Sequence, residues 1–286
     1  MLKLGRREFA DTDLLVMAIV NRTRDSFYDN GATFAEDKAL DRVRQVVAEG
    51  ADIVDVGGVK AGPGEEVDAA EEIRRTAGFV AKVRAEFPDV VISVDTWRAE
   101  VGREVCRAGA DLLNDAWGGH DHGLAEVAAE HDAALVCAHT GGLAPRTPPH
   151  RMGYDDVVRA AIDDTVALAE RAVSVGVRRD SVLIDPAHDF GKNTWHSLEI
   201  TRRLDEMVAT GWPVLVSLSR KDFVGEALDL PVGERLNGTL AATAVSAWHG
   251  ARVYRAHDVA ATRQVLDMVA TIRGSRGPVR VVRGLA

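Results

Sequence analysis

The 286-residue sequence has few cysteines and no surplus of basic residues. Its two cysteines, Cys106 and Cys137, lie in apolar contexts and lack the spacing of metal ligands. This pattern indicates buried, reduced thiols and argues against both a disulfide framework and a zinc site. The net charge of -9 leaves no basic excess that could replace the counterions of a nucleic acid. We therefore expect no nucleic-acid partner.

Long apolar runs are also absent. No segment reaches the length of a membrane-spanning helix, and residues 1–9 lack the apolar stretch of a secretory signal. We therefore expect a cytoplasmic protein without a membrane partner. The hydrophobic fraction of 46% is still ample for a large core. Because no linker or low-complexity segment divides the chain, we expect one domain over residues 1–286.

Apolar strand-like segments alternate with helix-like segments along the whole chain. Such alternation is typical of βαβ units with parallel strands. Eight units fit a single closed (β/α)8 TIM barrel better than an open doubly wound sheet, because no G-x-G-x-x-G motif follows the first strand. Residues 2–9 resemble an extra strand beneath the barrel. The expected barrel strands are residues 14–20, 53–56, 90–94, 112–114, 134–137, 182–184, 214–218 and 253–254.

Several expected strands are apolar until they end in a polar side chain. Asp95, Asn114 and Asp185 each end one strand, a pattern typical of parallel strands buried on both faces. Because a barrel gathers the carboxyl ends of its strands at one mouth, these groups should lie within the width of one ligand. Two carboxylates and an amide suit a flat, nitrogen-rich ligand. Considered alone, each residue could instead be structural, as Asp185 before Pro186 could be a turn or capping residue.

Cationic and amide side chains follow other strands. Lys221 should face the mouth, where it could approach ring oxygens or a leaving group, although a solvated lysine at a helix start is the alternative. Alternation places Arg255 and His257 on one face of the last strand, where barrels often bind phosphate. Arginine suits bidentate phosphate contacts, although a salt bridge from Arg255 to Asp258 is the alternative. Asn21 ends the first strand, and its amide oxygen could ligate Mg²⁺.

These residues and the motifs around them resemble dihydropteroate synthase, an enzyme family of the folate pathway. The similarity extends over nearly the whole chain, and so many motifs in one order are highly specific. The matching stretches are Ile19-Val20-Asn21 with Asp25-Ser26-Phe27, residues 50–58, Ser93-Val94-Asp95-Thr96, Asn114-Asp115, Asp185-Pro186 with Phe190-Gly191-Lys192, Ser219-Arg220-Lys221, Glu234-Arg235-Leu236, residues 238–242 and residues 255–259.

The family condenses a dihydropterin pyrophosphate with p-aminobenzoate and releases pyrophosphate, on a (β/α)8 barrel. The resemblance also implies a homodimer formed through the late helices and a catalytic role for Lys221, Arg255 and Asp95. The residues that it assigns to the pterin are Asp95, Asn114, Asp185 and Lys221. Those that it assigns to the pyrophosphate are Asn21, Arg255 and His257, with Mg²⁺ placed at Asn21.

The departures from the family pattern cluster on the aminobenzoate side. The loop usually written G-G-E-S-T-R-P-G has the sequence Gly57-Gly58-Val59-Lys60-Ala61-Gly62-Pro63-Gly64, so the Ser-Thr-Arg of the aminobenzoate pocket is missing. Asp222 replaces the serine that usually follows S-R-K. At roughly 4 Å and an effective dielectric near 20, its charge would repel a ligand carboxylate by about 4 kcal/mol before screening. Pro63 and Phe190 remain where the family packs against the aminobenzoate ring.

We therefore expect a dihydropteroate synthase-like protein that retains the pterin-pyrophosphate pocket and has a degenerate aminobenzoate site. Its synthase activity should be absent or very low. The alternatives are an active dihydropteroate synthase, a non-catalytic pterin-binding or regulatory protein, and a related pterin-dependent methyltransferase domain. Because a neutral sulfone or sulfonamide avoids the charge of Asp222, such inhibitors are expected ligands.

Overall fold

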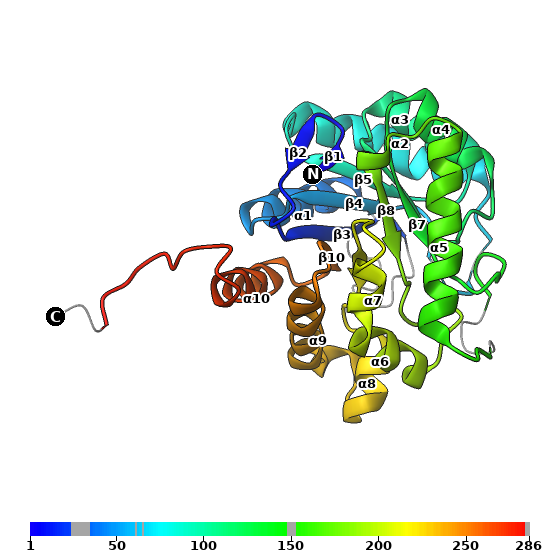
Figure 1. Cartoon of the computed structure of the whole chain (residues 1–286). Coiled ribbons are helices and arrows are strands. Elements are labelled where there is room, and N and C mark those ends of the chain that lie inside the picture. Colours follow the sequence, from blue (N-terminus) through cyan, green and yellow to red (C-terminus); the bar gives the residue numbers. More distant parts are fainter. Residues whose placement is uncertain (24–34, 61, 65, 148–152, 284–286) are drawn as a thin grey trace.

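The computed structural model describes residues 1–23, 35–60, 62–64, 66–147 and 153–283, and within these it shows a barrel of eight parallel strands (Figure 1). The strand order is β8-β7-β6-β5-β4-β3-β10-β9, and a bridge between Ile184 and Val214 joins its two ends. The predicted TIM barrel is therefore confirmed. The strands are β3 (Leu15–Asn21), β4 (Ile53–Gly57), β5 (Val91–Asp95), β6 (Leu112–Asp115), β7 (Ala134–Ala138), β8 (Val182–Asp185), β9 (Leu215–Ser217) and β10 (Val253–Ala256).

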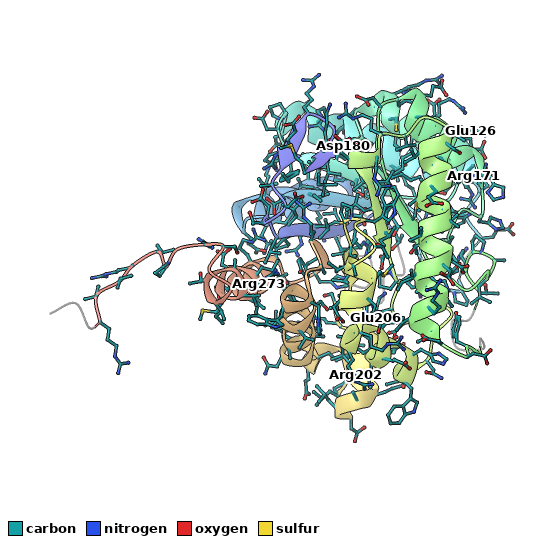
Figure 2. The ribbon with its side chains drawn as sticks, viewed as in Figure 1. Glu126, Arg171, Asp180, Arg202, Glu206 and Arg273 are labelled. Atoms are coloured by element: carbon teal, nitrogen blue, oxygen red, sulfur yellow. The ribbon has the colours of Figure 1, made fainter. Side chains whose placement is uncertain are left out.

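Helices surround the barrel and carry charged side chains on their outer faces. Figure 2 labels examples, among them Arg171, Arg202 and Glu206, all of which are exposed. None of the helices in the described ranges is long and apolar enough to span a membrane. The helices are α1 (Glu36–Ala48), α2 (Ala69–Glu86), α3 (Ala99–Ala108), α4 (Gly123–Glu130), α5 (Val157–Ser174), α6 (Thr194–Arg202), α7 (Leu204–Val208), α8 (Asp222–Leu228), α9 (Leu236–His249) and α10 (Val259–Ile272), with short 3-10 turns η1 (Arg179–Ser181) and η2 (Val232–Glu234).

Residues 2–9 form a hairpin instead of the single strand that we expected. β1 (Leu2–Leu4) pairs antiparallel with β2 (Arg7–Phe9), because Gly5 adopts a φ of 54° and lets the chain reverse. The apolar side chains of the hairpin join the buried cluster inside the barrel, at the amino-terminal ends of its strands. The hairpin therefore closes the amino-terminal end, and ligand access is left to the opposite end.

The side chains that point into the barrel are apolar at its amino-terminal end and polar at its carboxyl-terminal end. Near the amino-terminal end the inward side chains are apolar, as with Ile53 on β4 and Val91 on β5. Two residues further along the same strands the inward positions hold Asp55 and Ser93, both fully buried. Outward-pointing side chains of the strands pack instead with the helices in the main core cluster. The alternation thus concentrates the polar inward groups at the carboxyl ends of the strands.

Candidate functional site at the barrel mouth

A cavity of about 440 Å³ opens at the carboxyl ends of the strands. Its size is that of an ordinary small-molecule site. Pro63 is exposed and is not among the described residues that line this cavity, so its contact with an aminobenzoate ring stays a prediction. The other predicted site residues all line it: Asn21, Asp95, Asn114, Asp185, Phe190, Lys221, Asp222, Arg255 and His257.

Arg255 is held by two carboxylates across the mouth. Its Nε donates to Asp55 Oδ2 at 2.6 Å, and its Nη2 donates to Asp95 Oδ2 at 3.1 Å. Burial alone would lower the pKa of the guanidinium, but attraction from Asp55 and Asp95 raises it. Asp258 instead pairs with Arg220, at 2.9 Å, so the alternative of an Arg255–Asp258 salt bridge is wrong.

Asp55 is a site residue that the sequence reasoning missed. Its side chain is fully buried, and its Oδ1 accepts from Ser93 Oγ at 2.6 Å. The amide nitrogen of Asn114 lies 3.5 and 3.4 Å from its two oxygens. A signal was available, because Asp55 is the only charged residue of β4 and shares the inward face of Ile53.

The predicted pterin carboxylates, Asp95 and Asp185, are buried, and burial raises the pKa of each. Burial raises the pKa of Asp95 to about 7, against the opposing effect of Arg255. Burial also raises the pKa of Asp185, while Lys221 lowers it. One oxygen of Asp185 accepts from the backbone N–H of Ala187 at 2.7 Å. Each carboxyl group therefore has one oxygen committed to the protein and another that can face a ligand.

Lys221 reaches over the cavity beside these carboxylates. Its Nζ donates to the carbonyl oxygen of His188 and lies 4.8 Å from the centre of the Phe190 ring. Burial lowers its pKa, while Asp189 and Asp185 oppose that effect. A second lysine of the same region, Lys192, is nearly fully buried and donates to three backbone carbonyls, including that of His139 at 2.8 Å. Lys192 therefore holds the loop after β8 rather than a ligand.

His257 and Asn21 complete the predicted pyrophosphate side. Burial, together with the positive charge of Arg255, lowers the pKa of His257 to about 3. Its Nδ1 lies 3.0 Å from Ser219 Oγ, so the neutral ring can offer a hydrogen bond but no charge. Asn21 pairs in register with Gly57, where a Cβ atom would lie 3.2 Å from the Asn21 oxygen. Glycine at position 57 thus keeps room for that amide.

The side of the mouth predicted for the aminobenzoate is an apolar aromatic wall. The rings of Trp117 and Phe190 meet edge to face at 5.3 Å between centroids, and Trp97 lies 6.5 Å from Trp117. Val59 and Val67 pack on these rings. Val59 stands where the family usually has glutamate, so an apolar side chain fixes the loop after β4 to this wall. Sequence reasoning missed Trp97 and Trp117, which follow neighbouring strands with no motif to mark them.

Asp222 lies at the edge of the cavity and is already paired. Its Oδ1 accepts from Arg235 Nη1 at 2.8 Å, and its side chain is 80% exposed. Arg235 compensates part of the charge that we expected a ligand carboxylate to meet, so the repulsion of about 4 kcal/mol calculated for a bare charge pair is an upper limit.

Comparison with known proteins shows the family to which the chain belongs. A family model described as pterin binding enzyme matches residues 17–257. The chain is 59% identical to the inactive dihydropteroate synthase 2 of Mycobacterium leprae, covering 99% of this chain and 98% of the relative. It is 48% identical to the solved structure of Mycobacterium tuberculosis Rv1207, with a TM-score of 0.76 and coverage of 97% and 100%. For the Yersinia pestis dihydropteroate synthase in a sulfonamide complex, the identity is 32%, the TM-score 0.90 and the coverage 96% and 99%. The chain therefore belongs to the dihydropteroate synthase family of pterin-binding enzymes.

Proposed function

We propose that this protein binds a pterin at the barrel mouth and has lost, or nearly lost, dihydropteroate synthase activity. The observation that carries the proposal is the contrast between the two sides of the cavity. The pterin side keeps a connected polar network around Asp55, Arg255 and Asp95. The aminobenzoate side instead presents Val59 and Trp117. The name inactive dihydropteroate synthase 2, carried by the Mycobacterium leprae relative, supports the same conclusion.

The pterin would be recognised by acceptor groups. Asp95, Asn114 and Asp185 would accept hydrogen bonds from its N–H groups, and Lys221 would lie beside the ring. Arg255, Asn21 and neutral His257 would face the pyrophosphate. The related methyltransferase alternative is less well supported, since Lys221 and Arg255 suit a pyrophosphate leaving group.

The loss of activity would arise from poor positioning of the second reactant. In the synthase reaction the amine nitrogen of p-aminobenzoate bonds to the methylene carbon, the carbon–oxygen bond to pyrophosphate breaks, and the amine loses a proton. Lys221, Arg255 and Asp95 are the groups proposed to assist these steps. Because the Ser-Thr-Arg of the loop is replaced, the amine is no longer held at the methylene carbon. A misplacement of about 1 Å can cost on the order of 100-fold in rate.

Magnesium would enter this site together with the pyrophosphate. In the described part of the chain, no three His, Cys, Asp or Glu side chains are arranged to hold a metal ion. The Asn21 amide oxygen fits Mg²⁺ as one ligand when phosphate oxygens and water complete the shell. When bound, the ion neutralises charge on the leaving pyrophosphate. Mg²⁺ should therefore strengthen pyrophosphate binding to the native protein more than to Asn21→Ala, as measured by calorimetry.

A neutral sulfone or sulfonamide would be the better-matched second ligand. The aromatic wall of Trp117 and Phe190 offers edge and face contacts to another ring. The structure of the Yersinia pestis relative holds a sulfonamide drug complex, which supports this ligand class for the family site.

The protein is also proposed to form a homodimer through α9 and α10, which pack side by side (Figure 1). Val245 and Trp248 on α9 and Met268 and Ile272 on α10 are exposed apolar residues. Their exposure on adjacent helices makes a second copy the fitting partner. Both cysteines are free thiols, which fits a reducing compartment such as the cytoplasm.

A direct test of the pterin-binding proposal is titration with dihydropterin pyrophosphate, in the absence of p-aminobenzoate. Saturable one-site binding is expected, and Asp185→Asn should weaken it by about tenfold or more because a buried acceptor becomes partly a donor. Asp155→Asn, which changes an exposed carboxylate elsewhere on the surface, is the matched control and should bind normally. Absence of saturable binding by the native protein would refute the proposal.

A further inference from the structure

Asp55 lies at the centre of the polar network and touches groups from three other strands. Its Oδ1 accepts from Ser93 on β5, its Oδ2 accepts from Arg255 on β10, and the Asn114 amide of β6 faces both oxygens. We infer that Asp55 is a specificity-determining positioning residue: it fixes the direction of the Asn114 amide, so that the pocket presents an acceptor there to a ligand N–H group. This inference rests on the proposed pterin binding and extends it.

The direction of the amide follows from the chemistry of its partners. An ionised carboxylate accepts hydrogen bonds and donates none. The Asn114 side chain therefore turns its NH₂ group toward Asp55, at 3.5 and 3.4 Å, because its own oxygen would be repelled there. Within the described residues nothing donates to the Asn114 oxygen, although Asn114 lines the cavity. The oxygen is thus left for the ligand.

Two independent contacts make both carboxyl oxygens of Asp55 hydrogen-bond acceptors, as the orientation of the Asn114 amide requires. Ser93 Oγ and Arg255 Nε both donate to it at 2.6 Å, one to each oxygen. Arg255 can only donate, so Asp55 Oδ2 must remain an acceptor. The ligand-facing acceptors are then the Asn114 oxygen and the remaining oxygens of Asp95 and Asp185. A flat ring must present N–H groups to all three.

Asp55→Asn tests the inference because it keeps the shape of the side chain and changes its hydrogen bonding. The oxygen of the new amide has to face Arg255 Nε, which turns its NH₂ group toward Ser93 and Asn114. Asn114 must then turn its oxygen toward position 55 and its NH₂ group toward the ligand. A donor now meets the N–H edge of the pterin, and pterin affinity should fall by about tenfold or more.

The exchange variant Asp55→Asn/Asn114→Asp provides the decisive comparison. It keeps the same two groups and the same net charge, with their positions swapped. The carboxylate at position 114 accepts from the new amide and again offers an acceptor to the ligand. We expect it to recover pterin affinity to within about threefold of the native protein, a non-additive result that identifies a direct coupling. If Asp55 only held Arg255 in place or only stabilised the fold, the exchange would not restore binding.

The experiment measures the affinity of pterin itself, without pyrophosphate, by calorimetry at one pH, with thermal unfolding to check that each variant folds. Asp52→Asn is the matched control: it removes a carboxylate just before β4, at the closed end, where Asp52 accepts from the backbone of Val16. This control should bind pterin normally. If Asp55→Asn does not fold, the exchange variant alone carries the test. Normal binding by Asp55→Asn, or no recovery in the exchange variant, would overturn the inference. If the native protein bound no pterin, the proposed function would fail first.

Discussion

Replacing Asp222 by serine should strengthen the binding of p-aminobenzoate and leave a neutral sulfone unchanged. Asp222 is the first residue of α8 and lines the edge of the cavity, on the side proposed for the aminobenzoate carboxylate. Two unit charges roughly 4 Å apart repel by about 4 kcal/mol at an effective dielectric of 20, and by about 1 kcal/mol in bulk water.

The surroundings of Asp222 favour the smaller of these two repulsion energies, about 1 kcal/mol. Its side chain is 80% exposed, so water screens most of its field, and Arg235 neutralises part of its charge at 2.8 Å. We therefore expect a gain of about 1 kcal/mol, which is roughly a fivefold tighter dissociation constant for p-aminobenzoate. The gain should shrink as salt concentration rises, because exposed charges are screened.

The assay is a competition titration of p-aminobenzoate and a diaryl sulfone in the presence of dihydropterin pyrophosphate. Asp155→Ser serves as the control, since it removes an exposed carboxylate that does not line the cavity. If Asp222→Ser changed the affinity for both ligands equally, Asp222 would not face the ligand carboxylate. The reasoning about the degenerate side of the site would then be wrong.

Three further outcomes follow from the same structure. Because burial raises the pKa of Asp95 from 3.8 to about 7, the unliganded protein should lose stability as pH rises from about 4 to about 7 and show no further loss from this group above that. Pterin affinity should increase as pH rises through about 7, and thermal unfolding and calorimetry across this range test both signs. Trp117→Ala should lower the free energy of unfolding by about 3 kcal/mol, measured in urea, because it removes a buried ring from the aromatic wall. Trp248→Glu should give a monomeric mass by light scattering where the native protein gives a dimer, and a native monomer would contradict the proposed interface.

The sequence was sufficient for the barrel and for most of the mouth. Parallel strands buried on both faces are continuous apolar runs in the sequence, so the polar groups that end them could be identified as Asp95, Asn114 and Asp185. The contact between Asp55 and Arg255 could not be foreseen in the same way. These residues are separated by 200 positions and meet only because β10 closes on β3 beside β4.

The aminobenzoate side was harder to predict, for a different physical reason. Trp97, Trp117 and Val59 come from three separate strand–helix loops, and their packing depends on how those loops fold over the mouth. The pairing of Asp222 with Arg235 likewise depends on the close packing of α8 and the start of α9. Family resemblance showed which side chains had changed, but not which new partners the replacements would find.

The central claim is that pterin binding and synthase turnover are separated in this protein. The most direct measurement is the rate of pyrophosphate release from dihydropterin pyrophosphate at saturating p-aminobenzoate with Mg²⁺, on protein whose pterin binding has been verified by titration. The account predicts full occupancy and a turnover number at least about 100-fold below the usual lower range of about 1 per second. A turnover number of about 1 per second or more would contradict it.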